Sequence, residues 1–216
     1  MSETKSKNTL VHDALILFAI TIVAAIALGF VYEITKDPIE AAEAQAKIDA
    51  YKAVFPDMDS TYDAPNRDLA IYQAMIDEDS ELEGTTIDEV LEARDASGSH
   101  LGWVMTLTNS KGYGGDITIT IGITDQPGPD MTCTLNGIEF LSISETAGLG
   151  MKAKNDDFKD QFIGAEVNRY SLTKRNISGD TEIDAISSAT ITTTAVTRAV
   201  DAGLLIGQYL LALSSY

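Results

Sequence analysis

A run of 19 residues without a charged side chain, residues 14–32, constrains this 216-residue chain more than any other feature. As a helix it would extend about 28 Å, close to the thickness of the hydrocarbon core of a bilayer. A core helix of a soluble domain usually has a polar face, and this run offers little beyond Thr21. We therefore predict an uncleaved transmembrane helix. The alternative is a cleaved signal peptide, whose apolar region is usually shorter and is followed by a small-residue cleavage site.

The charges beside this run predict its orientation. Lys5 and Lys7 precede it, whereas the residues that follow are mostly acidic, with Lys36 as the nearby cation. Because positively charged flanks tend to stay in the cytoplasm, we expect residues 1–13 to be cytoplasmic. The rest of the chain would then be an extracytoplasmic part anchored to the cell membrane by residues 14–32.

The residues after the apolar run predict a stalk and then a folded domain. Asp37 can cap a new helix and Pro38 suits its first turn, so we expect a stalk helix over residues 39–55 that ends before Pro56. Residues 33–60 form this stalk and linker, and residues 61–216 form the domain. A short helix is expected at about residues 66–75.

The middle of the domain predicts antiparallel strands. Residues 89–94 and 100–108 flank a turn at 96–99 and are typical of a hairpin. Residues 116–124 alternate strictly, with four isoleucines on one face and mostly threonines on the other, which indicates a strand. Residues 126–130 predict a turn.

The sheet is expected to continue over residues 131–135 and 137–144, with Asn136-Gly137 as a tight turn between two strands. Residues 189–213 then predict a long final helix. Its apolar stripe consists of Ile191, Ala195, Ala199, Ala202, Ile206, Leu210 and Leu213. Residues 203–213 are more apolar than one stripe requires, so another protein of a complex could cover them. An antiparallel sheet flanked by helices is an α+β domain.

Composition excludes several functions. The net charge of −18 argues against nucleic acid as a partner, because phosphate backbones need clustered Lys and Arg. Cys133 is the single cysteine, in a strand-like run, and we expect a half-buried structural thiol. The two histidines lie in no metal-ligand spacing, and no metal site or catalytic triad is predicted.

The segment from Asp184 to Thr190, DAISSAT, opens the final helix and points to a phosphate site. Free N–H groups and the positive end of the helix dipole make such a place favourable for an anion. The alternative from the residues alone is an ordinary helix cap by Ser187 or Ser188.

Two further motifs precede this segment: Lys111-Gly112-Tyr113-Gly114-Gly115, and Glu145-Thr146-Ala147-Gly148-Leu149-Gly150. With the N-terminal apolar run, the three motifs resemble the FMN-binding subunits of the Rnf and Nqr respiratory complexes, RnfG and NqrC. The resemblance extends from about residue 8 to the end. Compactness and short loops favour Rnf.

The resemblance implies an electron-transfer subunit rather than a complete enzyme. FMN would be bound covalently, through a phosphoester to Thr190, and Asp184 would be read by the flavin transferase that attaches it. No catalytic residue is implied. The cofactor-binding residues would be Thr190, Ser187, Ser188, Ala189, Thr192, Glu145, Thr146, Gly148, Leu149, Tyr113 and Gly114. Partners would be the other membrane subunits of Rnf, which couples electron flow between ferredoxin and NAD to Na⁺ or H⁺ export, or of Nqr, which couples NADH-to-quinone electron flow to such export.

Two positions depart from the family pattern. Ala147 stands where the family usually has Pro, and Ser188 where it usually has Gly. A glycine requirement at position 188 would mean a positive φ or no room for a side chain. Two other functions stay open from the sequence. One is an anchored binding or assembly module without flavin, and the other is a flavin-bearing regulator or reductase outside either complex.

Overall fold

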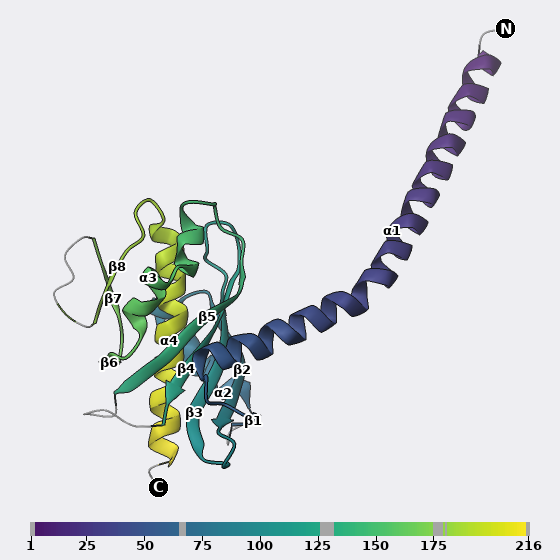
Figure 1. Cartoon of the computed structure of the whole chain (residues 1–216). Helices are drawn as coiled ribbons and strands as arrows, with labels where there is room; N and C mark the ends of the chain where they lie inside the picture. The colour runs from purple at the N-terminus through teal and green to yellow at the C-terminus, as the bar shows by residue number, and fades with distance from the viewer. Residues whose placement is uncertain (1–2, 65–67, 126–131, 175–178, 180, 215–216) are drawn as a thin grey trace. The chain divides into compact units, whose positions relative to one another are not determined.

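The computed structural model describes residues 3–64, 68–125, 132–174, 179 and 181–214 (Figure 1). The chain divides into two compact units, one ending at Ala46 and the other beginning at Lys47. We describe each unit by itself.

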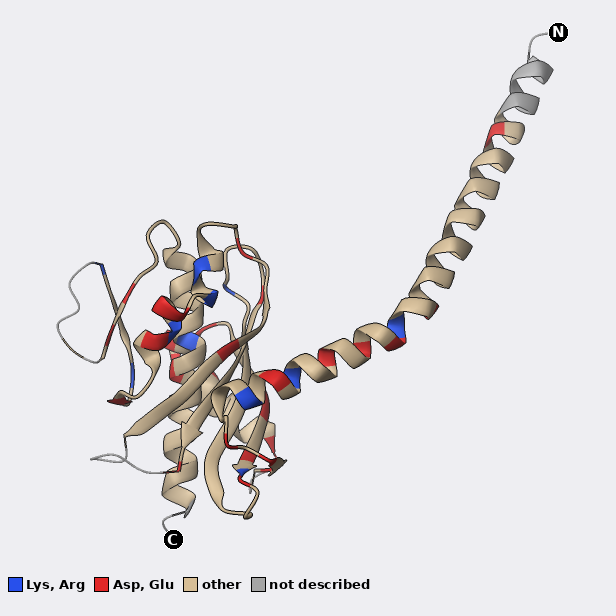
Figure 2. Ribbon diagram, viewed as in Figure 1, with Lys and Arg blue, Asp and Glu red and all other residues tan. Residues whose placement is uncertain are grey.

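The first unit is formed by a single long helix, α1 (Glu3–Val54), whose last turns belong to the second unit. The predicted break before a separate stalk helix is wrong, since Pro38 lies inside α1. A proline within a helix removes one backbone hydrogen bond, and the helix-forming sequence on both sides outweighs that loss here. Figure 2 shows the charge-free stretch of α1. Two helical segments are long and apolar enough to cross a membrane, Leu10–Val54 and Thr190–Leu213.

The second unit contains a six-stranded antiparallel sheet with the strand order β1-β2-β3-β4-β5-β6. Its strands are β1 (Ser60–Asp63), β2 (Thr85–Arg94), β3 (His100–Asn109), β4 (Ile117–Thr124), β5 (Cys133–Ile143) and β6 (Glu166–Val167). The predicted hairpin is confirmed as β2 and β3. The predicted isoleucine-rich strand is β4. The turn predicted at residues 126–130 lies outside the described residues.

Helices and a small second sheet complete this unit. They are α2 (Leu69–Glu78), η1 (Ser80–Leu82), η3 (Gly150–Lys154), α3 (Asp156–Lys159), η4 (Asp160–Phe162), the parallel pair β7 (Ser171–Thr173) and β8 (Glu182–Asp184), and α4 (Thr190–Ser214). The short helix expected at 66–75 is observed later, as α2. It begins where the Asp68 side chain accepts a hydrogen bond from Ala70 N at 3.0 Å, which caps its first turn.

The main core lies between α4 and the isoleucine face of β4. Ile117, Ile119, Ile121 and Ile123 are all fully buried. A Cβ at Gly203 would lie 2.1 Å from Ile121 Cδ1, so α4 approaches the sheet closely at this point. The end of α4 is covered by the domain itself, because Leu204, Ile206 and Leu210 are buried in this core. The expectation that another protein covers residues 203–213 is therefore not needed for this part of the helix.

The cysteine lies deeper than predicted. Cys133 is fully buried in the core, and its thiol donates a weak hydrogen bond to Leu204 O at 3.7 Å. Burial raises the pKa of this thiol to about 12, which makes it a structural side chain rather than a reactive one.

The opposite face of the sheet packs against the end of α1. Val54 and Phe55 lie over glycines, and a Cβ at Gly137 would come within 2.8 Å of Val54 Cα. The predicted turn at Asn136-Gly137 is wrong: β5 runs through both residues, with a register shift against β4. Asn136 donates its side-chain amide to Val54 O instead of closing a turn. With these corrections, the predicted α+β class is confirmed.

A candidate cofactor pocket at the start of helix α4

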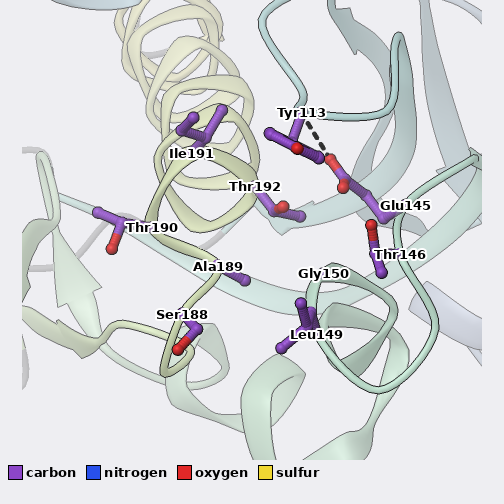
Figure 3. A pocket seen from close by; sticks show the side chains of 10 residues that line it. All are labelled: Tyr113, Glu145, Thr146, Leu149, Gly150, Ser188, Ala189, Thr190, Ile191 and Thr192. Carbon is purple, nitrogen blue, oxygen red and sulfur yellow. Dashed lines mark hydrogen bonds between the residues drawn. The ribbon is translucent and has the colours of Figure 1, made fainter.

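Three loops and the first turn of α4 enclose a cavity of about 520 Å³ (Figure 3). The loops join β3 to β4, β5 to η3, and β8 to α4, so each of the three sequence motifs supplies one of them. The lining residues are Tyr113, Glu145, Thr146, Leu149, Gly150, Ser188, Ala189, Thr190, Ile191 and Thr192. Its volume lies in the range of small-molecule and cofactor sites.

The β3–β4 loop is held against the start of the β5–η3 loop. Tyr113 N donates a hydrogen bond to Glu145 Oε1 at 2.8 Å. A Cβ at Gly114 would lie 2.1 Å from Ser144 O, so only glycine allows this contact between backbones. Gly114 supports the pocket wall without lining the cavity.

The β5–η3 loop folds back on itself and meets α4. Thr146 O accepts hydrogen bonds from Leu149 N at 3.1 Å and Met151 N at 3.2 Å. A Cβ at Gly150 would come within 2.7 Å of Thr192 Oγ1, which shows how closely this loop approaches the first turn of α4. Gly148 shapes the loop with a φ of 77° but does not line the cavity.

The β8–α4 loop contains the strained residue that the sequence predicted. Ser188 has a φ of 65°, and among the described residues it is the one non-glycine with a positive φ. The left-handed conformation costs a residue with a Cβ about 1–2 kcal/mol. The family preference for glycine at this position is therefore explained by backbone geometry, with a serine tolerated here.

A buried threonine one turn inside α4 fixes this loop. Thr193 Oγ1 accepts a hydrogen bond from Ile186 N at 3.1 Å and donates one to Ala189 O at 2.9 Å. The helix begins at Thr190, directly after Ala189, and within the described part of the chain neither Ser187 nor Ser188 caps it. The alternative of a serine cap is thus wrong. The sequence analysis missed Thr193, because its hydroxyl acts through helical spacing rather than in a local motif.

The first turn of α4 presents donors to the pocket. Helix geometry leaves the N–H groups of its first residues without partners inside the helix. In the described residues, no group accepts from the N–H of Thr190, Ile191 or Thr192. Thr190 is exposed and also lines a second cavity of about 510 Å³. The attachment candidate therefore lies on the wall shared by two cavities.

The remaining predicted residues divide between these cavities. Ser187 and Asp184 line the second cavity rather than the first, together with Lys174. Asp184 ends β8 and is held by its backbone, because Asp184 N donates to Gln161 Oε1 at 2.7 Å. The sequence analysis did not single out Lys174, which is isolated in the sequence and joins the site only through the fold.

The rim of the first cavity is apolar and open. Tyr113, Leu149 and Ile191 are 71%, 40% and 53% exposed. The sequence assigned Ile191 to the buried stripe of the final helix. That assignment is wrong, because the core begins one turn later and the first turn faces the cavity. An open apolar rim above a ring of N–H and hydroxyl groups suits a ligand with a flat apolar part and an anionic end.

Comparison with known proteins places the chain in a family. Residues 112–205 match the FMN-binding domain, and residues 1–54 match the RnfG N-terminal region. The RnfG-type subunit of the Na⁺-translocating ferredoxin:NAD⁺ oxidoreductase complex of Acetobacterium woodii is 29% identical over 200 residues, or 91% of this chain and 90% of that protein. The corresponding subunit of the ion-translocating oxidoreductase complex of Methanosarcina acetivorans is 26% identical, over 93% of this chain and 94% of its own length.

Among solved structures, NqrC of Shewanella oneidensis is similar with a TM-score of 0.47 and 20% identity, over 59% of this chain and 61% of that one. The family assignment rests on the sequence matches, which include both the N-terminal region and the domain that holds the three motifs. The chain belongs to the RnfG family and carries its FMN-binding domain.

Proposed function

We propose that this protein is an electron-transfer subunit of a membrane-bound, ion-translocating Rnf complex, with FMN attached through a phosphoester to Thr190. One observation carries the proposal. Three motifs that lie up to about 80 residues apart in the sequence meet in one cavity at the start of α4, inside the segment that matches the FMN-binding domain.

The start of α4 fits the phosphate end of the cofactor. Thr190 is exposed, and the N–H groups of Thr190, Ile191 and Thr192 have no protein acceptor among the described residues. Such groups, with the positive end of the helix dipole, stabilise an anion. The left-handed turn at Ser188 lets the chain enter the helix without placing a side chain over this turn.

The cavity fits the ring end. Tyr113, Leu149 and Ile191 supply apolar surface around the opening, and the glycine contacts at Gly114 and Gly150 bring the loops close enough to narrow it. When bound, FMN supplies the electron chemistry. The residues of this chain bind and orient the cofactor, and the apolar rim limits water at one edge of the ring. A covalent tether would keep the cofactor at high local concentration.

Attachment requires a second protein, a flavin transferase, for which we propose Asp184 as a recognition residue. Asp184 lies at the mouth of the cavity next to the one that holds Tyr113, and Thr190 lines both. A transferase could therefore approach Thr190 from the side of Asp184 while the ring enters from the other side.

We further propose that α1 anchors the domain, with residues 1–13 in the cytoplasm and the FMN domain outside it. The partners would be the other subunits of a complex that transfers electrons between ferredoxin and NAD, as the name of the Acetobacterium relative states for that protein. The match of residues 1–54 to the RnfG N-terminal region favours this function over that of NqrC.

Intact mass tests the attachment. The full chain would be co-expressed with a flavin transferase, purified in detergent, and compared with Thr190→Ala and with the control Thr194→Ala, one turn further into α4. We expect a gain of one FMN less one water in the wild type and the control, and no gain in Thr190→Ala. Flavin fluorescence in denaturing gels should follow the same pattern. An unmodified wild type, or a modified Thr190→Ala, would contradict the proposal.

A further inference from the structure

The charge in the cofactor pocket comes from one side chain. Of the ten residues that line the cavity, Glu145 alone is charged, and no Lys or Arg is among them. Lys111, the cation of the β3–β4 loop, is turned to Glu83, with its Nζ 2.8 Å from Glu83 Oε1. The carboxylate of Glu145 therefore has no cationic partner in the pocket wall.

The carboxylate is also fixed in place. Glu145 Oε1 accepts the hydrogen bond from Tyr113 N, and Figure 3 shows the side chain directed toward Tyr113. Glu145 Oε2 lies against Gly150, where a Cβ would come within 2.7 Å of it. A negative charge is thus held between the two loops that the proposed function assigns to the flavin ring.

From this geometry we infer that Glu145 lowers the reduction potential of the bound FMN, an inference that rests on the proposed function. Reduction adds negative charge to the ring system, and a fixed carboxylate in a partly desolvated cavity opposes that addition. The oxidised cofactor carries less charge and is affected less. Glu145 acts here as a positioning residue through Tyr113 N and as an electrostatic one through its charge.

The two roles can be separated by substitution. Glu145→Gln keeps an oxygen that can accept from Tyr113 N and removes the charge, whereas Glu145→Ala removes both. The matched control is Glu166→Gln, which removes an exposed carboxylate on β6 that does not line the pocket. The control corrects for the effect of one charge on a protein of net charge −18.

The measurement is the midpoint potential of the flavinylated full chain, by spectroelectrochemical titration with dithionite. In the titration FMN gains electrons from dithionite, which is oxidised to sulfite, and takes protons from the buffer. At a fixed potential we expect Glu145→Gln to increase the ratio of reduced to oxidised FMN about tenfold, or about 30 mV for a two-electron couple. Glu166→Gln should change it less than twofold.

A flavinylated Glu145→Gln with the potential of the wild type would overturn the inference and leave the proposed function standing. A wild type without FMN would overturn the proposed function, and the inference with it. If Glu145→Gln did not accept FMN, Thr146→Lys would decide. It places a cation beside the carboxylate and keeps the Tyr113 hydrogen bond, so an unchanged potential in Thr146→Lys would also overturn the inference.

Discussion

The two ends of α4 follow different rules, although they belong to one helix. From Ala195 to Leu211, most residues are buried and pack against the sheet. In the first turn, Thr190 and Ile191 are exposed, and the preceding Ser188 is in a left-handed conformation. The buried part is optimised for stability, whereas the first turn contains an exposed apolar side chain and a strained residue. Such departures are expected where a chain binds something.

The largest difference between the two ends should appear in a pair of identical substitutions. Ile206→Ala removes a fully buried side chain from the core, and we expect a loss of about 2–5 kcal/mol in the free energy of unfolding. Ile191→Ala removes a side chain that is 53% exposed, and we expect a loss below about 1 kcal/mol. Urea denaturation of the detergent-solubilised chain measures both values. Equal losses would contradict the assignment of Ile191 to the pocket rim.

The loop at the start of α4 should depend on one buried hydroxyl. Thr193→Val leaves Ile186 N without its acceptor, and we expect a loss of about 1–3 kcal/mol together with less complete flavin attachment. Thr197→Val is the matched control, because Thr197 Oγ1 only donates back to Thr193 O within the helix. Urea denaturation and the fraction of flavinylated protein by intact mass are the measurements. Equal effects of the two variants would show that the bond to the loop is not what matters.

The smallest effect should come from relieving the strain at position 188. Ser188→Gly removes the cost of the left-handed conformation and adds some entropy to the unfolded chain, so we expect a net gain of about 0.5–1 kcal/mol. Ser187→Gly lacks the strain to relieve and should instead be neutral or destabilising by up to about 1 kcal/mol. Thermal denaturation of both variants tests this. A loss of stability in Ser188→Gly would contradict the geometry of the turn.

The parts of the fold with strong periodicity were predicted well from the sequence. The isoleucine alternation of residues 116–124 indicated β4, and the apolar spacing of residues 189–213 indicated α4 within one residue at each end. The hairpin of β2 and β3 was also recognised from its turn. These segments repeat one signal several times, so a single unusual residue does not change the outcome.

The errors lie where a distant contact overrides a local signal. Asn136-Gly137 is a favourable turn pair, but Gly137 is needed so that Val54 can pack on the strand. Pro38 is a favourable helix start, yet α1 continues through it. Ile191 fits the helical stripe, but its side chain lies at the pocket rim rather than in the core. Spacing in the sequence does not reveal these outcomes, because each depends on how the surrounding segments are arranged.

The site was predicted to the extent that motifs carry it. Eight of the eleven predicted cofactor-binding residues line one cavity, although they come from three loops. The geometry adds Thr193 and Ile191, which have no motif. It also separates Ser187 and Asp184 into the second cavity, which no local pattern could have shown.

The central claim is that three separate loops hold one cofactor. Hydrogen–deuterium exchange of the flavinylated wild type, compared with the unflavinylated Thr190→Ala variant, tests it most directly. The account predicts slower exchange with FMN in all three loops, at residues 110–116, 144–151 and 185–192, and no change in the buried part of α4. Protection confined to residues 185–192 would contradict it, since the cofactor would then be tethered at Thr190 without entering the pocket.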